Sequence, residues 1–341
     1  ALIMGNTILF KLPKHGVLAH YPLLQAFKEA FPPGTVNTIY GRGAEVIPAL
    51  MESGKVNVLA FIGSSKVANG LKKLHPKPNR LRSILSLDGK NAAIVTKHAD
   101  LEVAVNECLL GALSFNGQRC TALKLIFVHR DVAEVFVQKL SDAVATLIPG
   151  LPWDKDVKIT PLPEVDKPGY LKDCLDDAIA NGAKIMNENG GYTNNSFVFP
   201  AVVYPVTSVM KLYHEEQFGP IIPVVSFDAI DEPVQYQINA SHGMQVSIFS
   251  TDPKEVAQLI DPFVNLVSRV NINCQSQRGP DVFPFTGRKD SAEGTLSVFD
   301  ALRSFSIRSL VATKITEANK DLFNTIVKDH ASNFLHTDYI F

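Results

Sequence analysis

Short apolar runs alternate with amphipathic stretches over the first 90 residues, a pattern typical of β-α-β units that build a parallel sheet. Strands are predicted over residues 7–12, 36–40, 56–62 and 81–87. Apolar side chains recur at helical spacing over residues 23–31 and 44–51, and Pro32, Pro33 and Gly34 end the first of these helices. Residues 56–62 are almost wholly apolar, as expected of a strand buried on both faces.

The same alternation continues to residue 272 and predicts an α/β fold. Helices are predicted over residues 101–115, 133–147 and 171–186, and strands over residues 197–203, 221–227, 246–250 and 266–272. Residues 149–169 are rich in Pro, Lys and Asp, so we expect a surface excursion there. Residues 317–341 mix charged with scattered aromatic side chains, and no element is predicted for them.

Composition narrows the class of partner. A chain of 341 residues with 46% hydrophobic residues can fill the cores of two domains. The formal net charge of -1 gives no electrostatic reason to expect a nucleic acid or an anionic membrane as partner. The apolar runs are all well short of the roughly 20 residues that span a bilayer. A small soluble substrate is therefore expected.

The four cysteines suggest a reducing compartment. They are widely spaced and lack the spacing of zinc ligands, so neither a disulfide framework nor a metal site is predicted. The chain opens with Ala1 and not with an initiator Met, so we expect an N-terminal part to be missing. A cytoplasmic location is expected, and organellar targeting stays open for the same reason.

The sharpest chemical signal is the segment FNGQRCTA at residues 115–122. Here Cys120 follows a glycine-containing turn and stands beside Arg119. A cation and oriented backbone N–H groups favour the thiolate, which is the form that attacks a carbonyl carbon. A lone cysteine is by itself more often a buried structural residue.

This segment resembles the catalytic-cysteine signature of aldehyde dehydrogenases, particularly the NADP-dependent non-phosphorylating glyceraldehyde-3-phosphate dehydrogenase branch. Further motifs follow in family order. ALIMGN runs into FKLP within residues 1–13, and FIGSS stands at 61–65, EEQFGP at 215–220, QRGPD at 277–281 and FPF at 283–285. Five motifs in one order make coincidence a poor explanation.

The resemblance implies a doubly wound, parallel-sheet NAD(P)-binding domain at residues 1–87 and an α/β catalytic domain at residues 88–300. Residues 301–341 would hold an oligomerisation strand, near residues 307–314, and a tail. It also implies a homodimer or homotetramer that oxidises an aldehyde to the acid through a cysteine thioester. Cys120 would be the nucleophile, and its backbone N–H would form half of the oxyanion hole.

For the cofactor, the resemblance assigns Lys11 to the adenine-ribose side. Lys14 stands where NAD-preferring members commonly place a Glu, and a second cation suits the additional phosphate of NADP. NADP is therefore expected, with NAD as the alternative. Ser64 would bind the pyrophosphate at a helix N-terminus, and Ala68 replaces a usual glycine in that helix.

Five further residues are carried over from the family motifs. Glu216 would accept hydrogen bonds from the nicotinamide ribose, and Phe218 would pack against the nicotinamide ring. Arg119 and Arg278 would bind a substrate phosphate, because guanidinium groups can hold phosphate oxygens in bidentate fashion. Phe285 would line the substrate pocket.

One motif departs from the family. Where members have Glu-Leu-Gly-Gly-Lys, this chain reads SLDGK at residues 86–90, so Ser86 replaces the general base that activates water. Three functions stay open: an active dehydrogenase using Asp88 or another base, an enzyme that passes its acyl group to coenzyme A, and a catalytically impaired homologue with a binding or structural role. Asp88 is more easily understood as a turn residue before Gly89.

Overall fold

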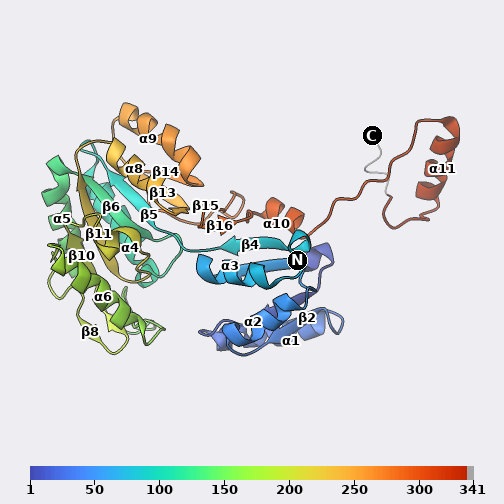
Figure 1. Ribbon diagram of the computed structural model, residues 1–341, viewed down its shortest axis with the longest axis horizontal. Coiled ribbons are helices and arrows are strands. Elements are labelled where there is room, and N and C mark those ends of the chain that lie inside the picture. The colour runs from blue at the N-terminus through green and yellow to red at the C-terminus, as the bar shows by residue number, and fades with distance from the viewer. Residues whose placement is uncertain (336–341) are drawn as a thin grey trace. The chain divides into compact units, whose positions relative to one another are not determined.

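The largest sheet of the computed structural model has seven strands in the order β14-β13-β5-β6-β11-β10-β7 and belongs to the larger of two units (Figure 1). The structure describes residues 1–335, and the units are Ala1–Phe305 and Ser306–Phe341. The strands of this sheet are β5 (Asn91–Val95), β6 (Leu123–His129), β7 (Lys184–Ile185), β10 (Ala201–Tyr204), β11 (Ile221–Phe227), β13 (Gln245–Phe249) and β14 (Arg269–Ile272). All pairings are parallel except that of β7 with β10.

Helices cover both faces of this sheet. They are α4 (Leu101–Leu113), α5 (Arg130–Ala145), α6 (Lys167–Ala180), α8 (Asp231–Asn239) and α9 (Pro253–Leu266). Ile94 belongs to the core cluster with α6, α8 and α9, whereas its neighbour Val95 belongs to the cluster with α4 and α5. Alternate strand residues thus point into different cores, which is why these strands are apolar throughout. The predicted α/β fold class with a parallel sheet is confirmed.

The first 87 residues form two smaller pairs of parallel strands. Their elements are β1 (Ile8–Lys11), α1 (Tyr21–Ala30), β2 (Val36–Ile39), α2 (Gly43–Glu52), β3 (Val58–Ile62), α3 (Ser65–Leu74) and β4 (Arg82–Ser86). β1 pairs with β2, and β3 pairs with β4. The far edge of β4 is covered by β16 (Ala292–Glu293), which runs antiparallel to it. The domain boundary expected after residue 87 stays a prediction.

Shorter elements connect these layers. They are η1 (Leu2–Met4), η2 (Val17–His20), η3 (Pro78–Arg80), η4 (Ser114–Gly117), β8 (Thr193–Asn194), β9 (Phe197–Val198), α7 (Lys211–His214), β12 (His242–Gly243), β15 (Arg288–Lys289) and α10 (Val298–Ser304). The second unit contains α11 (Glu317–Lys328), whose N-terminus is capped by the Thr316 hydroxyl. None of the helices within residues 1–335 has the length and apolar character needed to cross a bilayer.

Several predicted elements differ from the structure. The helix expected over residues 171–186 ends at Ala180, because Asn181 and Gly182 close it, and β7 follows. The strand expected over residues 197–203 is divided at Pro200 into β9 and β10. β6 and α11 were not predicted. The structure shows no strand over residues 307–314. A strand needs a neighbouring strand for its backbone hydrogen bonds. The role of this segment in assembly stays a prediction.

A buried lysine joins the turn after β4 to the turn before β11. The Lys90 Nζ donates to the Glu215 carbonyl at 2.6 Å and to the Gln217 Oε1 at 2.7 Å. The Gln217 Nε2 in turn donates to the carbonyls of Lys124 and Ile221. Burial, assisted by the nearby Lys124 ammonium, lowers the pKa of Lys90 to about 7. These contacts fix the two turns that carry candidate site residues.

The depressed pKa of Lys90 predicts a pH-dependent stability. An unfolded lysine has a pKa of about 10.4, so between pH 7 and that value Lys90 binds more protons in the unfolded chain than in the folded chain. The contribution of Lys90 to the free energy of unfolding should therefore rise with pH, by at most about 1.4 kcal/mol per pH unit. Urea unfolding of the protein and of Lys90→Met at pH 7, 8 and 9 measures it. If the free energy of unfolding changed equally with pH in the two proteins, the depressed pKa of Lys90 would be refuted.

Candidate functional site

A tight left-handed turn presents Cys120. Phe115, Asn116 and Gly117 have φ values of 54°, 57° and 71°. A Cβ on Gly117 would lie 2.6 Å from the carbonyl oxygen of Gly219, so glycine alone fits at this point. The Asn116 side chain holds the turn from the other side, exchanging two 3.0 Å hydrogen bonds with Thr160. The turn is thus fixed by backbone shape and by a side-chain amide.

Asn91, the first residue of β5, holds the chain that follows. Its Nδ2 donates to the carbonyls of Cys120 at 2.8 Å and Ala122 at 3.0 Å, and its Oδ1 accepts from the Gln245 N–H. Cys120 is half-buried, and within residues 1–335 its backbone N–H has no hydrogen-bond acceptor. The thiol and this free N–H therefore lie at the amino ends of β5, β6 and β13.

A β-bulge directs a lysine toward Cys120's segment. Asn91 pairs with Leu123 and Ala92 with Leu125, so Lys124 is the extra residue between them. Its buried Nζ lies 2.6 Å from the Glu216 Oε1, 2.5 Å from the Arg119 carbonyl and 5.3 Å from the centre of the Phe218 ring. Burial lowers the pKa of Lys124, and Glu216 opposes that shift. The sequence interpretation missed Lys124, although a lysine within an apolar strand is a recognisable signal.

Two of the residues assigned to the nicotinamide side meet around this ammonium. The Glu216 Oε1 accepts from the Gly89 N–H at 3.2 Å in addition to its contact with Lys124. Phe218 has a positive φ of 43°, and the Lys167 Nζ lies 5.9 Å from its ring centre. The Glu216 carboxylate therefore connects the turn after β4 with the bulged strand β6.

The residue in the general-base position lies beside the thiol. Ser86 ends β4 and is buried, and its Oγ is 3.9 Å from the Cys120 Sγ. At this distance the hydroxyl makes a long, weak hydrogen bond to sulfur. A serine hydroxyl has no accessible basic form near neutral pH, so it can support the sulfur but cannot take a proton from water.

Asp88 points to another element. Its Oδ2 accepts from the Ser65 N–H and from the Ser65 Oγ, both at 2.7 Å, at the N-terminus of α3. Within the described residues no hydrogen bond joins Asp88 to Cys120. The geometry therefore gives no support to Asp88 as a substitute base.

The two arginines assigned to substrate phosphate have different surroundings. Arg119 donates from Nη2 to the Gly111 carbonyl at 3.4 Å, while its buried Nε has no partner among the described residues. Arg278 is exposed, pairs with Asp281 at 2.9 Å, and lies 5.4 Å from the Phe285 ring centre. Among residues 1–335 no hydrogen bond, ion pair or ring contact joins Arg278 or Phe285 to Arg119 or Cys120.

The residues assigned to the cofactor offer cations and a helix end. Lys11 ends β1 half-buried, Lys14 is exposed in the following loop, and the Ser64 Oγ caps α3 by accepting from the Val67 N–H at 3.3 Å. The carboxylate of Asp88 stands at the same helix end, which shows that an anion is accepted there. This donor set fits an anionic dinucleotide, provided that Asp88 moves aside.

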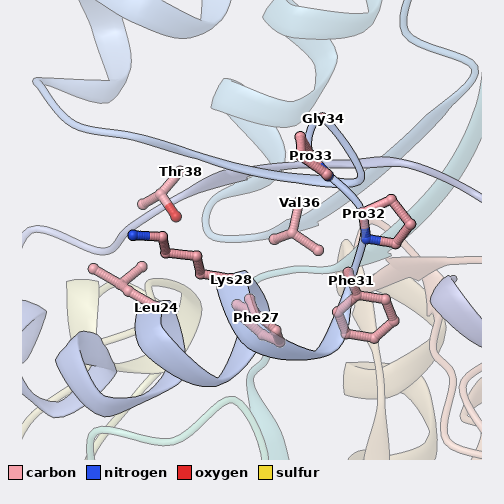
Figure 2. A pocket seen from close by; sticks show the side chains of 9 residues that line it. All are labelled: Leu24, Phe27, Lys28, Phe31, Pro32, Pro33, Gly34, Val36 and Thr38. Atoms are coloured by element: carbon pink, nitrogen blue, oxygen red, sulfur yellow. The ribbon is translucent and has the colours of Figure 1, made fainter.

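A pocket and a cluster of possible metal ligands lie apart from the residues predicted for the site. The pocket in Figure 2 lies between α1 and β2 and is lined by Leu24, Phe27, Lys28, Phe31, Pro32, Pro33, Gly34, Val36 and Thr38. It includes none of the predicted site residues. His98, Asp252 and Glu255 also cluster, with the His98 Nδ1 3.0 Å from the Glu255 Oε1, but Asp252 serves as the N-cap of α9 and Glu255 accepts from Ser250.

Comparisons with known proteins agree with the motifs. The model of the aldehyde dehydrogenase family matches residues 1–311. The NADP-dependent glyceraldehyde-3-phosphate dehydrogenase of Streptococcus equinus is 34% identical over 320 residues, which are 93% of this chain and 64% of that protein. The 3-sulfolactaldehyde dehydrogenase of Priestia aryabhattai is 30% identical over 300 residues, 86% of this chain and 60% of that protein.

Solved structures give the same answer. The chain superposes with a TM-score of 0.84 on an NADP-dependent glyceraldehyde-3-phosphate dehydrogenase from Bacillus halodurans complexed with NADP, at 31% identity, over 89% of this chain and 63% of the other. The chain thus spans somewhat less than two thirds of the length of these relatives. The resemblance identified from the motifs is confirmed, and the chain belongs to the aldehyde dehydrogenase family.

Proposed function

We propose that the protein oxidises an anionic aldehyde, such as glyceraldehyde 3-phosphate, to the acid through a thioester on Cys120, with NADP as cofactor. The observation that carries this proposal is the half-buried Cys120 on a fixed turn, with its own backbone N–H free of any acceptor within residues 1–335. The names of two relatives support the substrate class, since both aldehydes bear a strongly acidic group.

The first chemical step is addition of sulfur to the aldehyde. Arg119 precedes Cys120 in the chain, and the Lys124 Nζ lies 2.5 Å from the Arg119 carbonyl, so two cationic side chains belong to the surroundings of the thiol. Cations near a cysteine favour its thiolate form. The thiolate forms a C–S bond, and the carbonyl π electrons move to oxygen. The Cys120 N–H donates to the resulting oxyanion. When bound, NADP supplies the acceptor for the hydride that leaves this carbon, and the thioester remains.

Arg119 is the residue proposed to bind the substrate's anionic group. Its Nε is a buried donor that finds no partner in the part of the chain that the structure describes, and such a group is costly unless a ligand satisfies it. The aromatic ring of Phe115, whose centre is 5.9 Å away, restrains the guanidinium. Arg278, at present paired with Asp281, is the second proposed contact, and Phe285 under it would line the pocket.

Lys11 and Lys14 are proposed to hold the ribose and the 2'-phosphate of NADP, and Ser64 its pyrophosphate. Glu216 would accept from the second ribose, and Phe218 would pack on the nicotinamide. The carboxylate of Glu216 now rests on Lys124 and Gly89, so it is already oriented by two donors. Two relatives are NADP-dependent glyceraldehyde-3-phosphate dehydrogenases, which supports this choice of cofactor.

Hydrolysis of the thioester is the slow step in this proposal. Ser86 stands 3.9 Å from sulfur where members of the family have the base, and it cannot accept the proton of an attacking water. Transfer of the acyl group to a thiol such as coenzyme A is a second candidate, favoured by the same observation, because a thiolate needs no base at the moment of attack. An acyl-coenzyme A product would identify it.

Pre-steady-state mixing with NADP and glyceraldehyde 3-phosphate should give a burst of NADPH equal to the Cys120 concentration, followed by a slow steady rate. Cys120→Ser should abolish the burst because its hydroxyl is a far weaker nucleophile. Cys274, also a free and half-exposed thiol, provides the control, and Cys274→Ser should retain the burst. Absence of a burst in the unchanged protein would contradict the enzymatic proposal.

Restoring the missing base should accelerate hydrolysis. Ser86→Glu is expected to raise the steady rate by about 100-fold, the lower end of the usual effect of a general base. The burst amplitude should stay the same, since acylation does not use this group. Ser86→Gln has the same length without a basic oxygen and serves as control. Equal steady rates for the two variants would show that hydrolysis is limited elsewhere.

Arg119→Gln should weaken the apparent affinity for glyceraldehyde 3-phosphate by about 10-fold or more, because a charged hydrogen bond to phosphate is lost. The rate with glyceraldehyde, which has no phosphate, should change little. Arg130→Gln removes a surface arginine paired with Asp228 and is the matched control. An equal loss of rate with glyceraldehyde 3-phosphate and with glyceraldehyde would mean that Arg119 acts on Cys120 and not on the substrate anion.

A further inference from the structure

The N-terminus of α3 is capped twice, and the second cap comes from far away in the chain. Ser64 provides an ordinary local cap, accepting from the Val67 N–H. Asp88 adds a carboxylate from the turn after β4, 23 residues beyond Ser65, and takes both the N–H and the hydroxyl of Ser65. Two 2.7 Å hydrogen bonds to one carboxylate oxygen make this a strong, charge-assisted contact.

The hydrogen bond to Asp88 occupies the Ser65 N–H, a donor of the kind that binds phosphate at a helix N-terminus. The free N–H groups and the positive end of the helix dipole make a helix N-terminus a binding site for anions. A helix end offers a limited number of such donors, and a carboxylate held there also repels a second anion. Asp88 replaces the first glycine of the family's Glu-Leu-Gly-Gly-Lys, and a glycine has no group that could do this.

We propose that Asp88 is an internal competitor for the cofactor's diphosphate, so that NADP binds fully at α3 only when the Asp88 carboxylate is displaced. This inference rests on the proposed function. In this proposal the Asp88 carboxylate occupies the N-terminus of α3, where the diphosphate would bind, and so lowers the affinity of the protein for NADP.

The displacement of Asp88 is connected to the rest of the site. The next residue, Gly89, donates its N–H to the Glu216 carboxylate, and Lys90 then donates to the Glu215 carbonyl and to Gln217. Ser86, two residues before Asp88, lies against the Cys120 sulfur. Asp88 therefore belongs to the same turn as the residues that contact Cys120 and Glu216.

Nucleotide affinity, measured without turnover, tests the proposal. Titration of the protein with NADP by calorimetry is repeated with Asp88→Gly and Asp88→Asn. The Asn variant keeps the hydrogen-bond acceptor and removes the charge, so it separates repulsion from a merely structural cap. Both variants should bind NADP about tenfold more tightly, which corresponds to about 1.4 kcal/mol. Binding of adenosine, which carries no phosphate, should be the same in all proteins.

Asp100→Asn is the matched control, because Asp100 caps α4 by accepting from the N–H groups of Glu102 and Val103. It should leave NADP affinity unchanged. Equal NADP affinities for the unchanged protein and both Asp88 variants would overturn the competitor role alone. No NADP binding in any of these proteins would overturn it as well, and with no NADPH burst it would also reject NADP as the cofactor.

Discussion

The buried Lys124 ammonium is the charge on which the site depends. It reaches the Glu216 carboxylate, the Arg119 carbonyl and the face of Phe218, and so it joins the segment before Cys120 to the turn before β11. Removing one partner of such a buried pair leaves an uncompensated charge, at a typical cost of about 3–5 kcal/mol. Lys124 is the extra residue of a β-bulge, since the consecutive residues Asn91 and Ala92 pair with residues two apart on β6. A local irregularity of the sheet therefore organises the whole group.

Much of the fold could be predicted because its core strands are apolar on both faces. The strand at Ile221–Phe227 was predicted at its observed bounds, since an unbroken apolar run between polar turns has few other interpretations. β6 escaped prediction because Lys124 interrupts its apolar run, and only the tertiary contact with Glu216 explains that lysine. The boundary errors around α6 arose where Asn181 and Gly182 end a helix inside an otherwise helical pattern.

The candidate site was less accessible to sequence interpretation, which assigned residues but not their partners. The family motifs indicated Cys120, Ser86 and Glu216, and the structure brings Ser86 to Cys120 and Glu216 to Lys124. The role of Asn91 in holding the Cys120 carbonyl depends on two strands far apart in the chain, and no local pattern reveals it. The direction of the Asp88 side chain was likewise undetermined, because an aspartate in a turn can bond to many nearby donors.

Ser86 is held by its backbone from both sides. It pairs with Ile62 of β3 on one edge and with Ala292 of β16 on the other, and its carbonyl accepts from the Gly63 N–H. The main chain at this point is therefore independent of the side chain it carries. In descent from a common ancestor, the proton-accepting group could be lost or regained without rebuilding the scaffold. The ability to release an acyl group can thus evolve separately from the ability to form one.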